Sequence, residues 1–196
     1  DRLLKGLANY YIHSPQYKVY FHIIGDFFNP GEREEYMSII KENHLNPYVI
    51  LHGRQAGQML DLLFELCDFG IGSLGRHRSG ITNIKTLKNR EYAARGIPFI
   101  YSEIDEDFEN MPYIMKIPAN EEAVDIKQIL NFYNQLHITP LEIRNSIRHL
   151  SWNNQMKKVL DEMQKKDKIN LNNNNIANFA TLYTNKFIPN KEKWPH

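Results

Sequence analysis

The chain has 196 residues, a formal net charge of +1, 42% hydrophobic residues and a single cysteine. This apolar content is sufficient for a packed core, and the balanced charge excludes a global field that would attract nucleic acid. No apolar run reaches the roughly 18 residues that a membrane-spanning helix needs, and no signal peptide is visible. Because Cys67 has no partner in the chain, disulfides have no structural role, which indicates a reducing, cytoplasmic location.

Short apolar runs alternate with helical patterns over most of the chain. Helices are predicted where apolar residues recur every three or four positions, and strands where short apolar runs end at turn residues. The expected helices span residues 1–11, 32–45, 56–67, 86–95, 124–136 and 141–166, and the expected strands span residues 17–25, 48–52, 69–74, 98–102 and 113–118. The alternation predicts an α/β fold with a Rossmann-like parallel sheet, helices on both of its faces, and additional C-terminal helices.

The composition divides the chain into two parts. We expect residues 1–166 to form the α/β domain and residues 167–196 to form an Asn-rich linker followed by a C-terminal helix and tail. The linker is expected at NLNNNN, residues 170–175, and the helix over residues 176–187. The chain starts at Asp1 within a helical pattern, so we expect it to be a fragment of a longer protein.

Residues 73–102 contain a strand end, a basic loop, a helix and the next strand. Thr86 is a suitable N-cap for this helix, and Gly96 suits the left-handed position just after it. Six basic residues and one acid, Glu91, lie between positions 76 and 95. A helix N-terminus among cations is a good site for phosphate, and Glu91 is placed to accept hydrogen bonds from a sugar diol. The sequence therefore predicts a site for a nucleotide diphosphate and its ribose.

The same residues have simpler interpretations. Lys88 can be an exposed helix residue, and Glu91 can form an i,i+4 salt bridge with Arg95. Residues 70–75 match G-x-G-x-x-G, but the dinucleotide fingerprint needs a strand before and a helix after these glycines. We favour a strand kept thin for close backbone approach. The acidic run EIDEDFE, residues 103–109, is expected to be a solvated loop.

The histidines are scattered, so no metal site is expected, and no resident cofactor is expected either. His22 lies in an expected strand and is interpreted as a core residue with satisfied hydrogen bonds. His52 and His77 lie at an expected strand end and in the basic loop, which makes them better functional candidates.

Four sequence patterns together resemble the donor-binding domain of GT-B glycosyltransferases, and they are most similar to the retaining enzymes of family 4 (group 1). The longest is TLKNREYAARGIPFI at residues 86–100, which resembles the K-x-x-E-Y-x-A-x-G-x-P donor motif. FHIIGD at residues 21–26 and VILHG at residues 49–53 are similar to two strand signatures of the family. Ser151-Trp152 is similar to its C-terminal "F-S-W" helix. The match covers most of residues 1–166 in the right order.

The resemblance implies the C-terminal half of a two-domain transferase that uses a nucleotide-diphosphate sugar and no metal. The acceptor, a glycan or a lipid-linked glycan, would bind an N-terminal domain that these residues do not include. The implied setting is bacterial polysaccharide or lipopolysaccharide biosynthesis, including capsule, at the inner face of the membrane, with peripheral membrane association of the full-length enzyme. A fragment of this kind would be inactive by itself.

The resemblance also assigns residues to roles. As catalytic positions it implies Lys88, which assists at the diphosphate, and Asn83, which stands where many members have a glutamate that contacts the donor sugar. The implied nucleotide-sugar-binding residues are Gly25, Asp26, Gly53, Arg54, Arg78, Thr86, Leu87, Lys88 and Glu91.

Three alternatives stay open. The first is a GT-B-like module that binds nucleotide or sugar phosphate without catalysis, which Asn83 favours. The second is half of a dehydrogenase that uses residues 70–75, and the third is a flavodoxin-like interaction domain without a small ligand.

Overall fold

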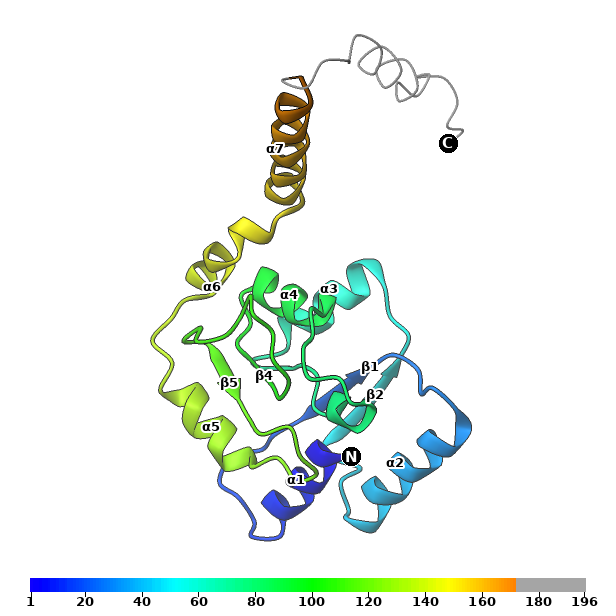
Figure 1. The fold of residues 1–196 in the computed structure, drawn as a ribbon. Helices are drawn as coiled ribbons and strands as arrows, with labels where there is room; N and C mark the ends of the chain where they lie inside the picture. The colour runs from blue at the N-terminus through cyan, green and yellow to red at the C-terminus, as the bar shows by residue number, and fades with distance from the viewer. Residues whose placement is uncertain (172–196) are drawn as a thin grey trace, which may run out of the picture. The chain divides into compact units, whose positions relative to one another are not determined.

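The computed structural model describes residues 1–171, and the side chains of residues 1–165. The chain divides into two compact units, residues 1–147 and residues 148–196 (Figure 1). The predicted helix over residues 176–187 and the predicted tail lie outside the described residues. The predicted Asn-rich linker also lies outside them, except for Asn170 and Leu171, which belong to the last described helix.

The first unit contains six α-helices, five strands and one 3-10 helix among the described residues. In chain order these are α1 (Arg2–Tyr11), β1 (Phe21–Ile24), α2 (Pro30–Glu42), β2 (Val49–Gly53), α3 (Gly57–Glu65), β3 (Gly70–Ile71), η1 (Arg76–Ser79), α4 (Leu87–Arg95), β4 (Phe99–Tyr101), β5 (Ile114–Lys116), α5 (Ile126–Asn134) and α6 (Pro140–Ser146). The α/β architecture is confirmed, and each strand is found where the sequence predicts one, although β1, β3, β4 and β5 are shorter than expected.

The single helical region expected over residues 141–166 is wrong, because two helices share it. α6 begins with a capping box in which Thr139 and Glu142 satisfy each other's backbone N–H groups. The second unit then contains η2 (Arg148–Leu150) and α7 (Trp152–Leu171). The Ser151 hydroxyl accepts the N–H of Asn154, so a new N-terminus forms inside the apolar pattern. The apolar residues of α7 are exposed, and these are Trp152, Met156, Val159, Leu160 and Met163.

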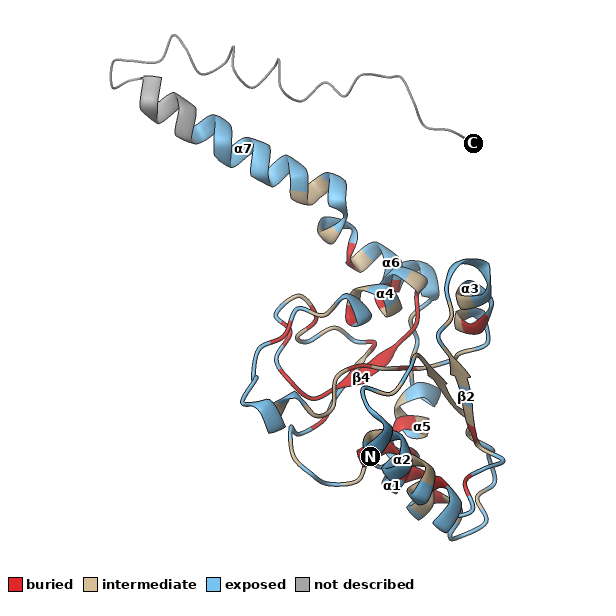
Figure 2. Cartoon of the chain, turned by 90° about the vertical axis from the view of Figure 1, so that its right-hand side faces the viewer, coloured by how far each residue is buried: buried red, intermediate tan, exposed pale blue. Residues whose placement is uncertain are grey.

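All strand pairs among residues 1–171 are parallel, but they form two sheets where one was expected. One sheet has the order β1-β2 and the other has the order β3-β4-β5. Figures 1 and 2 show α3 and α4 on one side of the strands and α1, α2 and α5 on the other side. The helical cover on both faces is therefore as predicted, whereas the sheet is interrupted between β1 and β3.

The core includes the fully buried strand β4 and an apolar cluster around α1. Phe99, Ile100 and Tyr101 of β4 are fully buried, as the red strand in Figure 2 shows. Leu4 and Leu7 of α1 are 1% exposed and belong to one apolar cluster that includes residues of both sheets. Burial of this apolar surface is what makes α1 part of the domain. α1 therefore shares one apolar cluster with residues of both sheets and with α2 and α5.

Candidate functional site

The start of α4 has the geometry that the sequence predicts. The Thr86 hydroxyl accepts the N–H of Asn89 at 3.4 Å, and Gly96 ends the helix with φ of 77°. The N–H groups of Leu87 and Lys88 precede this capped amide and have no acceptor in the described part of the chain. The helix therefore presents two free donors at its positive end.

α4 approaches β3 closely because β3 has glycines where other residues have a Cβ atom. A Cβ atom at Gly70 would lie 2.7 Å from the ring of Tyr92, and one at Gly72 would lie 2.8 Å from Asn89 Oδ1. Tyr92 also donates its hydroxyl to the Ile71 carbonyl, and burial raises the pKa of this phenol to about 12. Close approach is thus confirmed at Gly70 of β3 and at Gly72 just after it, whereas the strand itself is shorter than expected and Gly75 lies in open space.

The acidic loop after β4 fixes the start of α4, which corrects the expectation of a solvated loop. Glu103 and Asp105 are 2% and 0% exposed. Asp105 accepts hydrogen bonds from Asn89 Nδ2 at 3.0 Å and from Arg90 Nη1 at 3.3 Å. Glu103 Oε1 accepts the backbone N–H of Arg76 at 2.6 Å, while its Oε2 is buried without a partner among the described residues. The burial of these two carboxylates is tolerated because each accepts hydrogen bonds from donor groups of α4 or η1.

Four of the six predicted cations are neutralised by carboxylates. Arg78 pairs with Asp1 and Glu121, Lys85 with Glu106, Arg90 with Asp105 and Asp107, and Arg95 with Asp61 and Glu91. Arg76 and Lys88 have no carboxylate within 4.0 Å among the described side chains. Lys88 is an exposed residue of α4, as the simpler interpretation expected, but partial desolvation of its ammonium by the surrounding protein and the nearby charge of Arg76 both lower its pKa. The positive field at the start of α4 thus comes from these two residues.

Glu91 and Arg78 are occupied by other residues of the chain. Arg95 donates to Glu91 at 2.6 Å, so the i,i+4 pair that the sequence offered as the simpler interpretation is present. Arg78 donates to both Asp1 oxygens at 3.0 Å and binds Glu121, whose pKa falls to about 2 because Arg78 and His77 hydrogen-bond to it. Glu91 could bind a ligand only if it released Arg95 or shared its carboxylate with it. Arg78 would likewise have to release or share Asp1 and Glu121.

A second group of predicted residues meets where β1 and β2 end. The N–H of Gly25 donates to the Gly53 carbonyl at 2.8 Å, and Asp26 pairs with Arg54 at 3.2 Å. Gly25 and Gly53 have φ of 126° and 63°, which residues with side chains rarely adopt, and a Cβ atom on either would meet nothing within 4 Å. The resemblance predicted these four residues from two separate motifs, and the structure places them together in an open position.

The remaining predicted position, Asn83, lies in the segment before α4. Asn83 is exposed and forms a parallel bridge with Ile104, while the Ile84 N–H donates to the Ile104 carbonyl at 2.8 Å. Its side-chain amide contacts only the Thr82 hydroxyl at 3.4 Å among the described residues. The amide is therefore accessible from solvent.

His22 and His52 lie side by side on β1 and β2. His22 Nδ1 and His52 Nε2 are 2.9 Å apart and the rings are stacked, so one N–H···N bond joins them when one ring supplies the proton. Burial and the proximity of His52 lower the pKa of His22. The expectation of a hydrogen-bonded His22 is confirmed, with His52 as its partner, whereas the expectation of a core position is wrong because His22 is only half-buried.

This histidine pair predicts a pH dependence of stability. Since the pKa of His22 is lower in the folded chain than its ordinary value of 6.5, the unfolded state binds more protons near that pH. We expect the free energy of unfolding to fall as pH drops from about 7 to 5. Urea unfolding at several pH values measures this, and His22→Gln should flatten the dependence relative to the unchanged chain. An identical slope for both chains would contradict the prediction.

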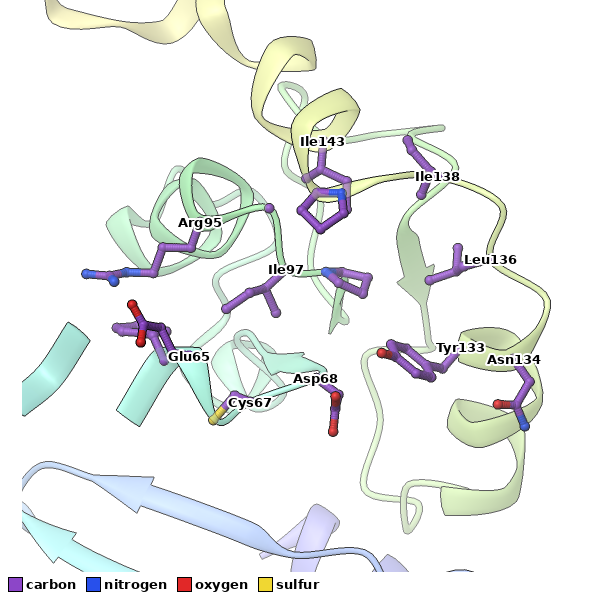
Figure 3. Close-up of a pocket in the computed structure, with 14 residues that line it drawn as sticks. Glu65, Cys67, Asp68, Arg95, Ile97, Tyr133, Asn134, Leu136, Ile138 and Ile143 are labelled. Carbon is purple, nitrogen blue, oxygen red and sulfur yellow. The ribbon is translucent and has the colours of Figure 1, made fainter. Parts of the chain in front are cut away.

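A pocket of about 560 Å³ lies on the side from which the strands start (Figure 3). Cys67 and Asp68 precede β3, and Ile97 precedes β4, so these lining residues lie at the amino ends of strands. Apolar side chains, among them Leu136 and Ile138, form one part of the lining in Figure 3. Ligands of open parallel sheets bind at the carboxyl ends instead, so we place the candidate site at the start of α4.

Within the described residues, no group of three or more His, Cys, Asp or Glu side chains is arranged to hold a metal ion. No helix in the same part of the chain has the length and apolar character that crossing a membrane requires. No protein-family model, curated protein or solved structure matches this chain.

Proposed function

We propose that the chain is the donor-binding part of a retaining GT-B glycosyltransferase of the group 1 type. It would take part in transfer of a sugar from a nucleotide-diphosphate sugar to an acceptor in polysaccharide or lipopolysaccharide biosynthesis. The observation that carries the proposal is the start of α4, where two backbone N–H groups without an acceptor lie near Lys88 and Arg76. Among the described residues, these are the two cations of residues 76–95 without carboxylate partners. The sequence resemblance supports the same position.

The chemistry of transfer explains why such a site is useful. When the donor bond breaks, negative charge accumulates on the oxygens of the departing nucleotide diphosphate. Backbone N–H groups at a helix start and fixed cations stabilise that charge without reorganising during the reaction. Because Asp105 holds Asn89 and Arg90 in the first turn of α4, the amides of this turn are fixed before the ligand arrives. A retaining transferase of this type needs no carboxylate pair with glycosidase spacing.

The proposal assigns the other predicted residues to parts of the donor. Glu91 would accept the ribose hydroxyls while sharing its carboxylate with Arg95, and Gly53 and Arg54 would lie near the nucleobase. Gly25 and Asp26 would line the cleft, and the acceptor would be bound by an additional domain in the cytoplasm at the membrane surface.

A module that binds the nucleotide sugar without transferring the sugar is the second candidate. The specific observation is Asn83, an exposed neutral amide where the resembling enzymes have a carboxylate. The two candidates share the diphosphate site and differ in turnover. Release of nucleotide diphosphate by the full-length protein in the presence of donor and acceptor would support the transferase.

We expect Lys88→Ala to weaken the binding of uridine or guanosine diphosphate by about tenfold or more. The reason is that a hydrogen bond to a charged group contributes about 1.5–3 kcal/mol, and tenfold corresponds to about 1.4 kcal/mol. A thermal-shift screen with nucleoside diphosphates and nucleotide sugars first identifies the ligand, because a ligand that binds only the folded state raises the melting temperature. Isothermal titration of the variant then gives the affinity ratio, and Arg76→Ala should behave similarly.

Matched variants separate this effect from general charge loss. Lys85 is also exposed and basic, but it already pairs with Glu106 at 3.7 Å, so Lys85→Ala should leave the affinity within about twofold. Glu91→Ala should weaken nucleotides that contain ribose and leave inorganic pyrophosphate unaffected. An equal loss of nucleoside and nucleoside diphosphate affinity in Lys88→Ala would mean that Lys88 does not face phosphate.

A further inference from the structure

Three helices end at the pocket shown in Figure 3. The last residues of α3, α4 and α5 are Glu65, Arg95 and Asn134, and all three line the pocket, whose volume is about 560 Å³. The carbonyl groups in the last turn of a helix make that end partly negative. α6 begins at the same pocket with Pro140, but the carboxylate of Glu142 in its first turn offsets the positive end of this helix. The backbone around the pocket therefore favours a cation.

The end of α4 already binds a cation of the chain itself. Arg144 of α6, which is not among the lining residues, donates to the Arg95 carbonyl at 3.3 Å. At the ends of α3 and α5, the described residues include no Lys or Arg side chain in the last turn or hydrogen-bonded to a helix carbonyl. The negative ends of these two helices are thus left for a cation from outside the chain.

The charged side chains of the lining act in the same direction. Glu65 and Asp68 line the pocket, and no Lys, Arg or His nitrogen of the described side chains lies within 4.0 Å of either carboxylate. Among the described lining residues, Arg95 is the only basic one, and carboxylates of α3 and α4 already bind its guanidinium. The lining therefore has two carboxylates whose charge no ion pair compensates.

The rest of the lining is largely apolar or aromatic. Leu136 and Ile138 form one part of it in Figure 3, and Phe64 and Tyr133 contribute aromatic rings. Burial and the nearby charge of Asp68 raise the pKa of Tyr133, which is consistent with a phenol close to this carboxylate. A small hydrated ion would lose water against such walls without gaining polar partners, whereas a cation with an apolar body would fill them. The volume is typical of sites for small organic molecules.

We propose that this pocket binds a small organic ammonium compound. Its aryl or alkyl body fills the apolar part of the pocket, and its ammonium group donates hydrogen bonds to the carboxylates of Glu65 and Asp68. The ends of α3 and α5 stabilise the same positive charge. The pocket lies at the end of α4 and the nucleotide site at its start, so this ligand site is independent of the proposed function.

The test uses three compounds of similar size that differ in charge, namely phenethylammonium, 2-phenylethanol and phenylacetate. Each is titrated into the isotope-labelled chain, and the amide chemical shifts are followed by NMR. Phenethylammonium should shift the amides of Cys67, Ile97 and Leu136, while those of Leu87 and Lys88 at the start of α4 stay unchanged. It should bind about tenfold or more tightly than 2-phenylethanol, because an ion pair and two helix ends each favour the cation. Phenylacetate should bind most weakly.

Variants of the lining carboxylates identify the source of this preference. Asp68→Asn and Glu65→Gln should each weaken phenethylammonium by about threefold and both together by about tenfold, with no effect on 2-phenylethanol. Glu34→Gln removes an exposed acid of α2 that does not line the pocket and should change neither affinity. Cys67 is the single cysteine and lines the pocket, so its alkylation by iodoacetamide should become slower when phenethylammonium is bound.

Several results would overturn the proposal. Equal affinities for phenethylammonium and 2-phenylethanol would show that the pocket does not recognise the charge. Full affinity in the double variant would show that the two carboxylates do not bind the ammonium group. Shifts confined to amides outside the lining, or no shift at any lining amide, would show that the compound does not enter the pocket.

Discussion

Gly6→Ala is expected to lower the free energy of unfolding by about 3 kcal/mol, although alanine normally favours a helix over glycine by about 1 kcal/mol. A Cβ atom at Gly6 would lie 2.0 Å from the Val124 carbonyl oxygen, which is backbone and cannot rotate away. The Val124 N–H donates to the Arg2 carbonyl at 3.1 Å, so this loop is tied to α1. Urea unfolding followed by circular dichroism measures the change.

Gly75→Ala is the matched control for this experiment. A Cβ atom at Gly75 would meet nothing within 4 Å, and its φ of −145° is accessible to alanine. The control should therefore change the free energy of unfolding by no more than about 0.5 kcal/mol. If Gly6→Ala were as stable as the unchanged chain, α1 would not lie against Val124, and the core described above would need to be revised.

Asp105→Ala is expected to cost about 3–5 kcal/mol of unfolding free energy, because removing one partner leaves buried donors unsatisfied. Asp105 is fully buried and binds both Asn89, which is also fully buried, and Arg90. The loss should also weaken nucleotide binding, since these contacts fix the first turn of α4. Urea unfolding gives the stability, and titration with nucleotide on the folded protein gives the binding.

Asp107→Ala separates burial from the simple loss of an ion pair. Asp107 pairs with the same Arg90, but its side chain is 21% exposed, so water can replace the lost contact. We expect a cost of no more than about 1 kcal/mol. Equal losses of unfolding free energy in the two variants would show that the burial of Asp105 adds nothing to the cost of losing an ion pair with Arg90.

The local signals for α4 were sufficient without any tertiary information. Thr86 and Gly96 determine where the helix starts and ends through their own side-chain and backbone chemistry, and both act within a few residues of sequence. In the same way, short apolar runs that end at turn residues were enough to place every strand of the first unit. Ser151 shows the limit of such signals, because an apolar stripe continued through a capping residue that starts a new helix.

The electrostatics of the site could not be inferred from the sequence in the same way. Six basic residues near one helix suggested a large positive cluster, but four of them find carboxylates, several from distant segments such as Glu121 and Asp61. The acidic residues 103–109 resembled a solvated run, yet Glu103 and Asp105 are buried because their partners approach from η1 and α4. Arg2 gave no signal at all, although its buried guanidinium donates to the Leu74 and Pro118 carbonyls.

The sequence by itself determined the order and type of the helices and strands as far as α5 and the caps of α4, because these depend on interactions between near neighbours in the chain. Only the tertiary structure decided which charges remain free and that the parallel strands form two sheets. Ion pairing, burial and strand pairing join residues that are far apart in sequence, so spacing along the chain contains little information about them. Among the described residues, Lys88 and Arg76 are distinguished from the other four cations because no carboxylate lies within 4.0 Å of their side-chain nitrogens, which depends on how the rest of the domain folds around them.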